Sequence, residues 1–196
     1  MSEDIFSFPT HAGNIKMEVT DEALTPFGGL VPFAAFLKKT NIIEDLSSSC
    51  PVERTSPNAS NVYDILVSFI LTSLCDGDRF NHVNRLRYDP TIPELFGVNK
   101  IVGDDTIRRL LNSIERVDGR KWVASNTQKM WSCLPKNFIL DWDSTVLTKY
   151  GNQEEVEIGY NPTKKGRPSL HPLFASIAGT RLVPYYMMRS GNTVSA

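Results

Sequence analysis

The sequence predicts an α/β protein in which an all-helical N-terminal domain, residues 1–135, precedes the start of a mixed sheet, residues 136–196. Two observations predict this division. Before Pro135, the apolar residues recur mainly at the spacing of amphipathic helices. After Pro135, they gather in short runs separated by turn-forming residues, a pattern typical of strands. The domain boundary is therefore expected near residue 135.

Five segments of the N-terminal part are predicted to be helical. Pro32 suits the first turn of the first segment, and Gly119 is expected to end the fourth. The second segment is apolar nearly all round, which predicts a central buried helix. The five segments are residues 28–46, 61–75, 79–90, 102–119 and 120–135. Residues 1–27 are expected to be irregular and only loosely packed.

Three runs in the C-terminal part are predicted to be strands. They are residues 137–147, 170–180 and 181–190. A polar segment rich in turn residues, 151–169, separates the first two runs. The last two runs are expected to be the next two antiparallel strands of the sheet.

Composition limits the function classes. The 196 residues are 41% hydrophobic and 22% charged, which is ordinary for a folded chain able to bury a core. The formal net charge of -1 excludes a globally basic nucleic-acid binder, although a local basic patch remains compatible with it.

The cysteines and the apolar runs indicate a soluble cytoplasmic protein. Cys50, Cys75 and Cys133 are odd in number and far apart in sequence, so they predict neither a disulfide framework nor a zinc site. Free thiols fit a reducing cytosol. The N-terminus has no secretory signal pattern, and the longest apolar run is shorter than the ~20 residues of a membrane span.

A pair of carboxylates follows an apolar run in the stretch "FILDWDSTVLTKYGNQ", residues 138–153. Side chains alternate along a strand, so Asp141 and Asp143 are expected on one face and Trp142 on the other. Two carboxylates side by side repel each other unless a divalent cation lies near them, and Mg²⁺ prefers such oxygen ligands. The alternative is that one aspartate caps the next turn and the other is merely solvated.

A basic segment lies between the acidic strand and the next one. It holds Lys164, Lys165, Arg167 and His171, with Tyr160 close by in sequence. Cations that neutralise phosphates beside carboxylates that hold metal would suit a DNA-processing enzyme, and the tyrosine could stack on a base or a sugar. An ordinary solvated turn is the alternative for the basic residues, and a structural role is the alternative for His171.

Two other features of the N-terminal part deserve a prediction. The string "CDGDRFNH", residues 75–82, lacks the spacing of a calcium loop and is expected to be a helix-ending turn. Five arginines fall on the predicted polar helix faces, where they either contact DNA or are solvated. They are Arg79, Arg85, Arg87, Arg108 and Arg109.

Two enzyme families share the local acidic pattern. The run from Leu140 to Thr145 resembles the first motif of haloacid-dehalogenase-type phosphatases, in which the first aspartate is the nucleophile. Only 61 residues run from Lys136 to Ala196, which is short for the domain that this motif opens. The phosphatase is therefore the weaker alternative.

The second resemblance is more extended. "LDWDSTVLTKYGNQEEVEIGYNPTKKGRPSLHPLFASIA", residues 140–178, resembles the central segment of DDE transposases of bacterial insertion sequences, specifically those of the group 1 type. The hallmarks matched are D-x-D-S/A-T, then Y-G-x-Q-E, then G-Y-N-P-x-K-x-G-R-P-S-x-H-P. "RSGNT" near the end also suits that group, and the helical part resembles its N-terminal region more loosely.

This resemblance implies a ribonuclease H-like sheet on which three acids hold two Mg²⁺ ions for DNA cleavage and strand transfer. Asp143 best matches the first catalytic acid, and Asp141 is a weaker candidate that would instead support it. The implied partners are DNA, at the terminal inverted repeats of an element, and a second copy of the chain. No membrane partner is expected.

The resemblance also implies that the second and third acids lie in later segments of such enzymes. The chain is therefore expected to be a truncated or frameshifted transposase, or one part of a split reading frame, and to be inactive alone. The alternative function is a truncated DNA-binding inhibitor of transposition. Three strands without covering helices would leave an open edge and an exposed apolar face, so poor solubility is expected.

Overall fold

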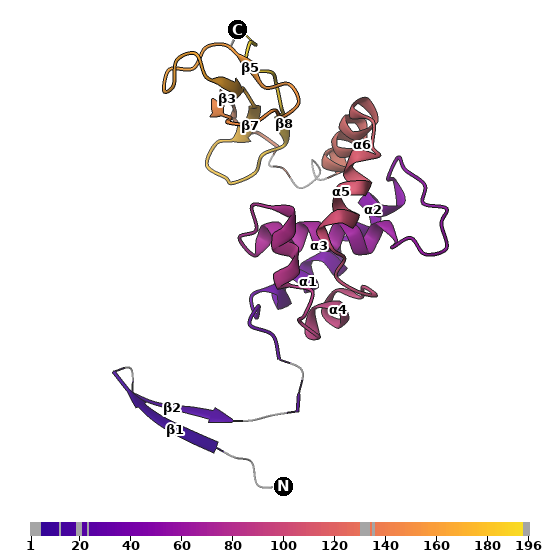
Figure 1. Cartoon of the computed structure of the whole chain (residues 1–196), viewed down its shortest axis with the longest axis vertical. Coiled ribbons are helices and arrows are strands. Elements are labelled where there is room, and N and C mark those ends of the chain that lie inside the picture. The colour runs from indigo at the N-terminus through magenta and orange to yellow at the C-terminus, as the bar shows by residue number, and fades with distance from the viewer. Residues whose placement is uncertain are drawn as a thin grey trace. The chain divides into compact units, whose positions relative to one another are not determined.

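The computed structural model describes residues 5–11, 13–18, 21–22, 24–129, 134 and 136–193 (Figure 1). The chain divides into two compact units, residues 1–116 and residues 117–196. Helices and small antiparallel sheets together make it a mixed α/β protein, as the sequence predicts. The boundary near residue 135 stays a prediction, and Cys133 and Pro135 lie outside the described residues.

A β-hairpin opens the described part of the chain, so the expectation of an irregular, all-helical N-terminus is wrong there. Strands β1 (Ile5–Thr10) and β2 (Gly13–Glu18) pair antiparallel, with Phe6 opposite Met17 and Phe8 opposite Ile15. These four apolar side chains alternate with polar ones and share one face of the hairpin. The alternation is that of a strand, and it was overlooked because each run is short.

The first predicted helix is two helices. α1 (Leu30–Thr40) ends and α2 (Ile42–Ser48) begins at Asn41, whose φ of 53° is left-handed. Asn41 donates its backbone N–H to the carbonyl of Leu37 and so closes the last turn of α1. Asparagine tolerates this conformation better than most residues, which explains why the chain bends there.

Helix α3 (Val62–Leu74) is the buried centre of the first unit, as predicted (Figure 1). The side-chain oxygen of Asn61 caps it by accepting the N–H of Asp64 at 2.6 Å. It packs against the elements that precede and follow it in the chain. Its buried residues are Asp64, Ile65, Leu66, Val67, Ser68, Leu71 and Thr72.

Shorter elements complete the first unit. They are the 3-10 helix η1 (Phe80–Arg85), α4 (Thr91–Phe96) and α5 (Asp104–Asn112). Helix α4 was not predicted, because Pro90 and Pro93 favour the end of a helix over its start; Asp89 caps this helix by accepting the N–H groups of Thr91 and Ile92. In α5, Ile107 and Leu110 are buried.

Helix α6 (Arg116–Lys129) spans the division between the units and contains Gly119. The prediction that Gly119 ends the preceding helix is therefore wrong. That helix, α5, ends at Asn112, and Ser113 caps it by donating its hydroxyl to the carbonyl of Leu110 at 2.7 Å. A glycine inside a helix costs about 1 kcal/mol relative to alanine but does not forbid the helix.

The segment between α4 and α5 is fastened to α3 by buried polar groups. Asp64 accepts the backbone N–H of Asn99 at 3.4 Å and its amide at 3.1 Å. Ser68 donates its hydroxyl to the carbonyl of Asp64 and accepts the N–H of Val102 at 3.0 Å. These bonds satisfy polar atoms that water does not reach, so the segment has a defined path over the core.

The second unit contains two three-stranded antiparallel sheets among the described residues. The first has the order β3-β7-β8, and the second has the order β4-β6-β5. The expectation of two antiparallel strands after the acidic one is confirmed by β7 and β8. The strands are β3 (Leu140–Ser144), β4 (Leu147–Thr148), β5 (Glu157–Ile158), β6 (Pro168–Leu170), β7 (Leu173–Ile177) and β8 (Tyr185–Met187).

The polar segment 151–169 is partly folded. β6 pairs with both β4 and β5, and the carbonyl of Pro168 accepts the N–H of Lys149 at 2.9 Å. Within the described part of the chain, no helix has both the length and the apolar character needed to cross a membrane.

Candidate catalytic strand and nucleic-acid interface

Strand β3 carries the two aspartates on one face. In its antiparallel pairing with β7, Asp141 lies opposite Ser176 and Asp143 lies opposite Phe174. Residues two apart on a strand project to the same side and are separated by about 7 Å. Asp141 and Asp143 therefore form an acidic pair on one side of the sheet, as their spacing predicts.

Both carboxylates are exposed to solvent. The carboxylate of Asp143 accepts its neighbour's backbone N–H, that of Ser144, at 2.7 Å. This bond turns one oxygen of Asp143 toward the backbone, and its remaining lone pairs are available to a ligand.

The opposite face of β3 is apolar and also exposed. Trp142 is 56% exposed, and its ring lies 5.4 Å from that of Tyr185, centre to centre. The two rings flank Ala175, which pairs with both residues and is fully buried. The face of an edge strand is buried only where other elements of the fold pack against it. The strand propensity of its own residues does not identify those elements.

The donor type of the acidic pair suits Mg²⁺, but the described residues supply only part of a metal site. Nowhere in the described ranges do three or more His, Cys, Asp or Glu side chains come together. After Asp143 the sequence contains three acids, Glu154, Glu155 and Glu157. These three glutamates precede β6 in the chain and form no group of metal ligands with Asp141 and Asp143. A complete set of ligands would need carboxylates beyond these.

The basic residues lie on a defined turn between β5 and β6. Asn161 is buried; its amide donates to the hydroxyl of Thr148 at 2.9 Å, and its oxygen accepts the N–H of Lys164 at 2.8 Å. Arg167 then donates its N–H to the carbonyl of Lys164 at 3.2 Å. Gly166 has a φ of +74°, which suits the third position of a type II turn.

The basic side chains predicted to bind phosphate are exposed on this turn. Lys164, Lys165 and Arg167 are all exposed, and so is Tyr160. The structure brings Lys164 and Arg167 together at Tyr150, which lies just after β4. Tyr150 was not predicted as a site residue, because its proximity to the turn depends on the pairing of β4 with β6.

His171 is placed differently from the other basic candidates. Its side chain is 3% exposed, and its Nε2 lies 3.3 Å from the hydroxyl of buried Ser169. Its backbone N–H donates to the carbonyl of Arg189, and the guanidinium of Arg189 donates to the His171 carbonyl. This geometry supports the structural alternative for His171; a direct DNA contact stays a prediction.

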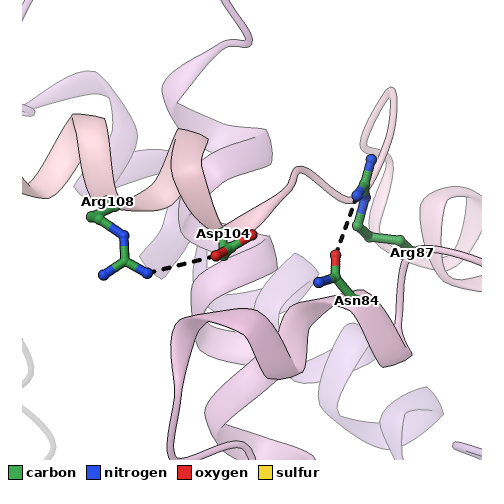
Figure 2. Close-up of polar contacts among 4 residues, drawn as sticks. All are labelled: Asn84, Arg87, Asp104 and Arg108. Carbon is green, nitrogen blue, oxygen red and sulfur yellow. Dashed lines mark hydrogen bonds and ion pairs between the residues drawn. The ribbon is translucent and has the colours of Figure 1, made fainter.

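The five arginines predicted on polar helix faces, Arg79, Arg85, Arg87, Arg108 and Arg109, are all exposed. Arg87 and Arg108 have local partners (Figure 2). Arg108 pairs with Asp104 at 3.6 Å along α5 and lies over the ring of Phe80 at 5.0 Å. Arg87 donates to the side-chain oxygen of Asn84 at 3.2 Å. Contacts of this kind fix where a guanidinium points while leaving other N–H groups for phosphate.

The string "CDGDRFNH" forms a helix-ending turn, as predicted. Cys75 caps α3, Asp76 has a left-handed φ of 56°, and Gly77 donates its N–H to the carbonyl of Thr72. His82 pairs with Asp78 at 3.1 Å.

Two groups in the first unit have a shifted pKa. Burial raises the pKa of the Cys75 thiol, and the charge of Asp76 raises it further. Burial also raises the pKa of Tyr63, with Glu44 and Asp64 adding to the effect. A raised pKa keeps the Cys75 thiol protonated and therefore a poor nucleophile near neutral pH.

Comparison with protein families assigns the chain. The second unit thus carries an exposed acidic pair on β3 and an exposed cationic turn between β5 and β6. The family described as Transposase DDE domain group 1 matches residues 8–196. The chain belongs to this family, whose general function is transposition, whose substrate is DNA and whose DDE domains generally use divalent metal. Comparisons with curated proteins and with solved structures found no match.

Proposed function

We propose that this chain carries the first catalytic acid of a DDE transposase from a bacterial insertion sequence, and that it binds the ends of the element. The observation that carries the proposal is the pair Asp141 and Asp143, which lie exposed on one face of β3 in a member of this family. Asp143 is the first metal-binding acid in this proposal, and Asp141 supports it. The cytoplasm is the proposed location, with a homodimer as the proposed assembly.

The β3-β7-β8 sheet supports a ribonuclease H-like arrangement. Its strands follow one another in chain order and are all antiparallel. We take β3 as the first strand of that sheet, with its acidic face turned toward the substrate.

The proposed mechanism divides the work between two regions. When bound, Mg²⁺ supplies Lewis-acid stabilisation of the oxygens that attack and leave phosphorus. Asp143 and Asp141 provide hard oxygen ligands on one side of the site. Lys164, Lys165 and Arg167 bind backbone phosphates and hold the strand in register. Within the described residues no third acid joins Asp141 and Asp143, so the chain is expected to bind DNA without cutting it.

Asp143 is expected to be the main metal ligand of the pair. Two carboxylates without further protein ligands should bind Mn²⁺ weakly, with a Kd of roughly 1 mM. Paramagnetic broadening of NMR signals from β3 and β7 would measure this affinity. Asp143→Ala should weaken Mn²⁺ binding about tenfold and Asp141→Ala should weaken it less. Removing a metal ligand lowers the affinity more than removing a residue that supports that ligand.

The control for this experiment is Asp118→Ala, an exposed acid in α6, which should leave the broadening of β3 unchanged. Equal broadening in wild type and Asp143→Ala would contradict the assignment. Nicking of element DNA by the chain with Mg²⁺, lost in Asp143→Ala, would show instead that the chain is catalytically complete.

The cationic turn is expected to contribute to the salt dependence of DNA binding. Replacing Lys164, Lys165 and Arg167 together with alanine should reduce the slope of log K against log salt by about 2 to 3, since each phosphate contact contributes about 0.9. Fluorescence anisotropy with a duplex of the terminal repeat would give the slope.

A matched control removes the same charge from the helical unit, with alanine at Lys38, Lys39 and Lys100, all exposed. The control should leave the slope nearly unchanged. If the two triple variants lower the slope equally, the turn has no special role and only net charge matters.

A second candidate function is a DNA-binding inhibitor of transposition. It is favoured by the incomplete set of metal ligands in the described residues. Retention of terminal repeats without cleavage, together with inhibition of a complete transposase in the same assay, would support it.

A further inference from the structure

The side chain of Tyr150 gathers two cations of the turn. The ammonium of Lys164 donates to the Tyr150 hydroxyl and lies 5.0 Å from the centre of its ring. The guanidinium of Arg167 lies 5.8 Å from the same ring centre. Tyr150 itself is 68% exposed, so these contacts lie on the surface and not in a core.

The backbone on both sides of this cluster is fixed by separate bonds. Asn161 joins β4 to the turn through Thr148 and through the N–H of Lys164. The hydrogen bond from Arg167 to Lys164 closes the turn. The N–H of Lys149, next to Tyr150, donates to the carbonyl of Pro168. Tyr150, Lys164 and Arg167 are therefore held near one another before any ligand arrives.

Two cations beside one ring would separate in water unless something held them. The hydroxyl of Tyr150 accepts from Lys164, and the negative face of its ring attracts Arg167. One of the three ammonium donors is used by that bond. Arg167 is exposed and its side chain has five N–H donors, none of which bonds to another of the described residues. Unused donors of two neighbouring cations, open to solvent, match the several acceptor oxygens of a phosphate group.

We infer that Tyr150 is a positioning residue that holds Lys164 and Arg167 together as one binding site for a single phosphate group. The inference rests on the proposed function in naming the DNA phosphodiester as the natural ligand. Tyr150 acts through the two cations and not by stacking on a base. Holding them in place reduces the conformational entropy that binding would otherwise remove from two long side chains.

The experiment uses the full chain with Tyr150→Ala and Tyr150→Phe, and with Tyr88→Ala as the control at another exposed tyrosine. Two titrations are compared. The first follows the NMR signal of the Arg167 side-chain N–H as inorganic phosphate is added. The second measures affinity for a terminal-repeat duplex, and its salt slope, by fluorescence anisotropy. Circular dichroism confirms that each variant keeps its fold.

Tyr150→Ala should weaken phosphate binding about fivefold, since it removes the hydrogen bond to Lys164 and the cation–π contact with Arg167. Tyr150→Phe keeps the ring and should lose less, and Tyr88→Ala should match wild type. On DNA, Tyr150→Ala should lower the salt slope by about 1, as Lys164→Ala does. The double variant Tyr150→Ala with Lys164→Ala should lose less than the sum of the two single losses, because each single variant already removes the contact between Tyr150 and Lys164.

Three results would overturn the inference. One is unchanged phosphate affinity in Tyr150→Ala. Another is weaker DNA binding with an unchanged slope, which would mean that the ring stacks on a base. The third is additive loss in the double variant. Phosphate binding that depends on Tyr150 in a chain that does not bind DNA would keep this inference and overturn the proposed function instead.

Discussion

Replacing Gly191 with alanine is expected to unfold the small β4-β6-β5 sheet. A Cβ atom at this position would overlap the carbonyl oxygens of Glu157 and Ser169, which belong to β5 and its neighbour β6. Gly159 faces it from the other side, since a Cβ there would overlap the carbonyl of Gly191. The backbone at Glu157 and at Ser169 cannot move away from the added Cβ atom without breaking the β5–β6 pairing. We expect a loss of more than about 4 kcal/mol in the free energy of unfolding of this sheet.

Hydrogen exchange monitored by mass spectrometry would locate the effect. Peptides covering residues 157–191 should lose protection, while peptides from α3 keep it. Two other glycines serve as controls: Gly28→Ala meets open space and should be nearly neutral, and Gly179→Ala, at a φ of +76° in open space, should cost about 1 kcal/mol in strain. Protection of residues 157–191 equal to wild type in Gly191→Ala would show that this close approach is not required.

Replacing Asp64 with alanine is expected to destabilise the helical unit by about 2 to 4 kcal/mol. Asp64 is 2% exposed and accepts both the backbone N–H and the side-chain amide of Asn99. Its removal leaves those donors without their acceptor and leaves a small cavity beside α3. The segment from Asn99 to Val102 should loosen as well, since Ser68 alone would then hold it.

Urea denaturation followed by circular dichroism would measure the change. Asp64→Asn keeps one acceptor oxygen and should lose less than Asp64→Ala. Glu115→Ala, at an exposed acid between α5 and α6, should change stability by no more than about 0.5 kcal/mol. If Asp64→Ala unfolds at the same urea concentration as Glu115→Ala, the buried hydrogen bonds contribute nothing net.

Local patterns predicted several elements correctly. Helix α3 is apolar on all sides, so its burial follows from composition alone, and the acidic pair shares a face because strands alternate. The break at Asn41 was not predictable from apolar spacing, which continues through it. Its cause is one left-handed residue, and periodicity does not register a single φ.

Features that depend on distant segments were not predictable. The cluster at Tyr150 depends on the pairing of β4 with β6. The same holds for the motif residues Asn161, Ser169 and Gly191, which the structure shows to be buried. Their role in the described structure is to hold the turn and the small sheet together.

The exposure of β3 also limits the concentration at which this protein stays dissolved without self-association. Among the described strands, β3 has a neighbour on one side only, and its apolar face carries exposed Leu140 and Trp142. Two molecules can associate by pairing their exposed β3 edges. The rate of this association rises at least with the square of the protein concentration, whereas the rate at which one chain folds does not depend on concentration. A cell that makes few copies is therefore protected from this association, and one that makes many copies is not.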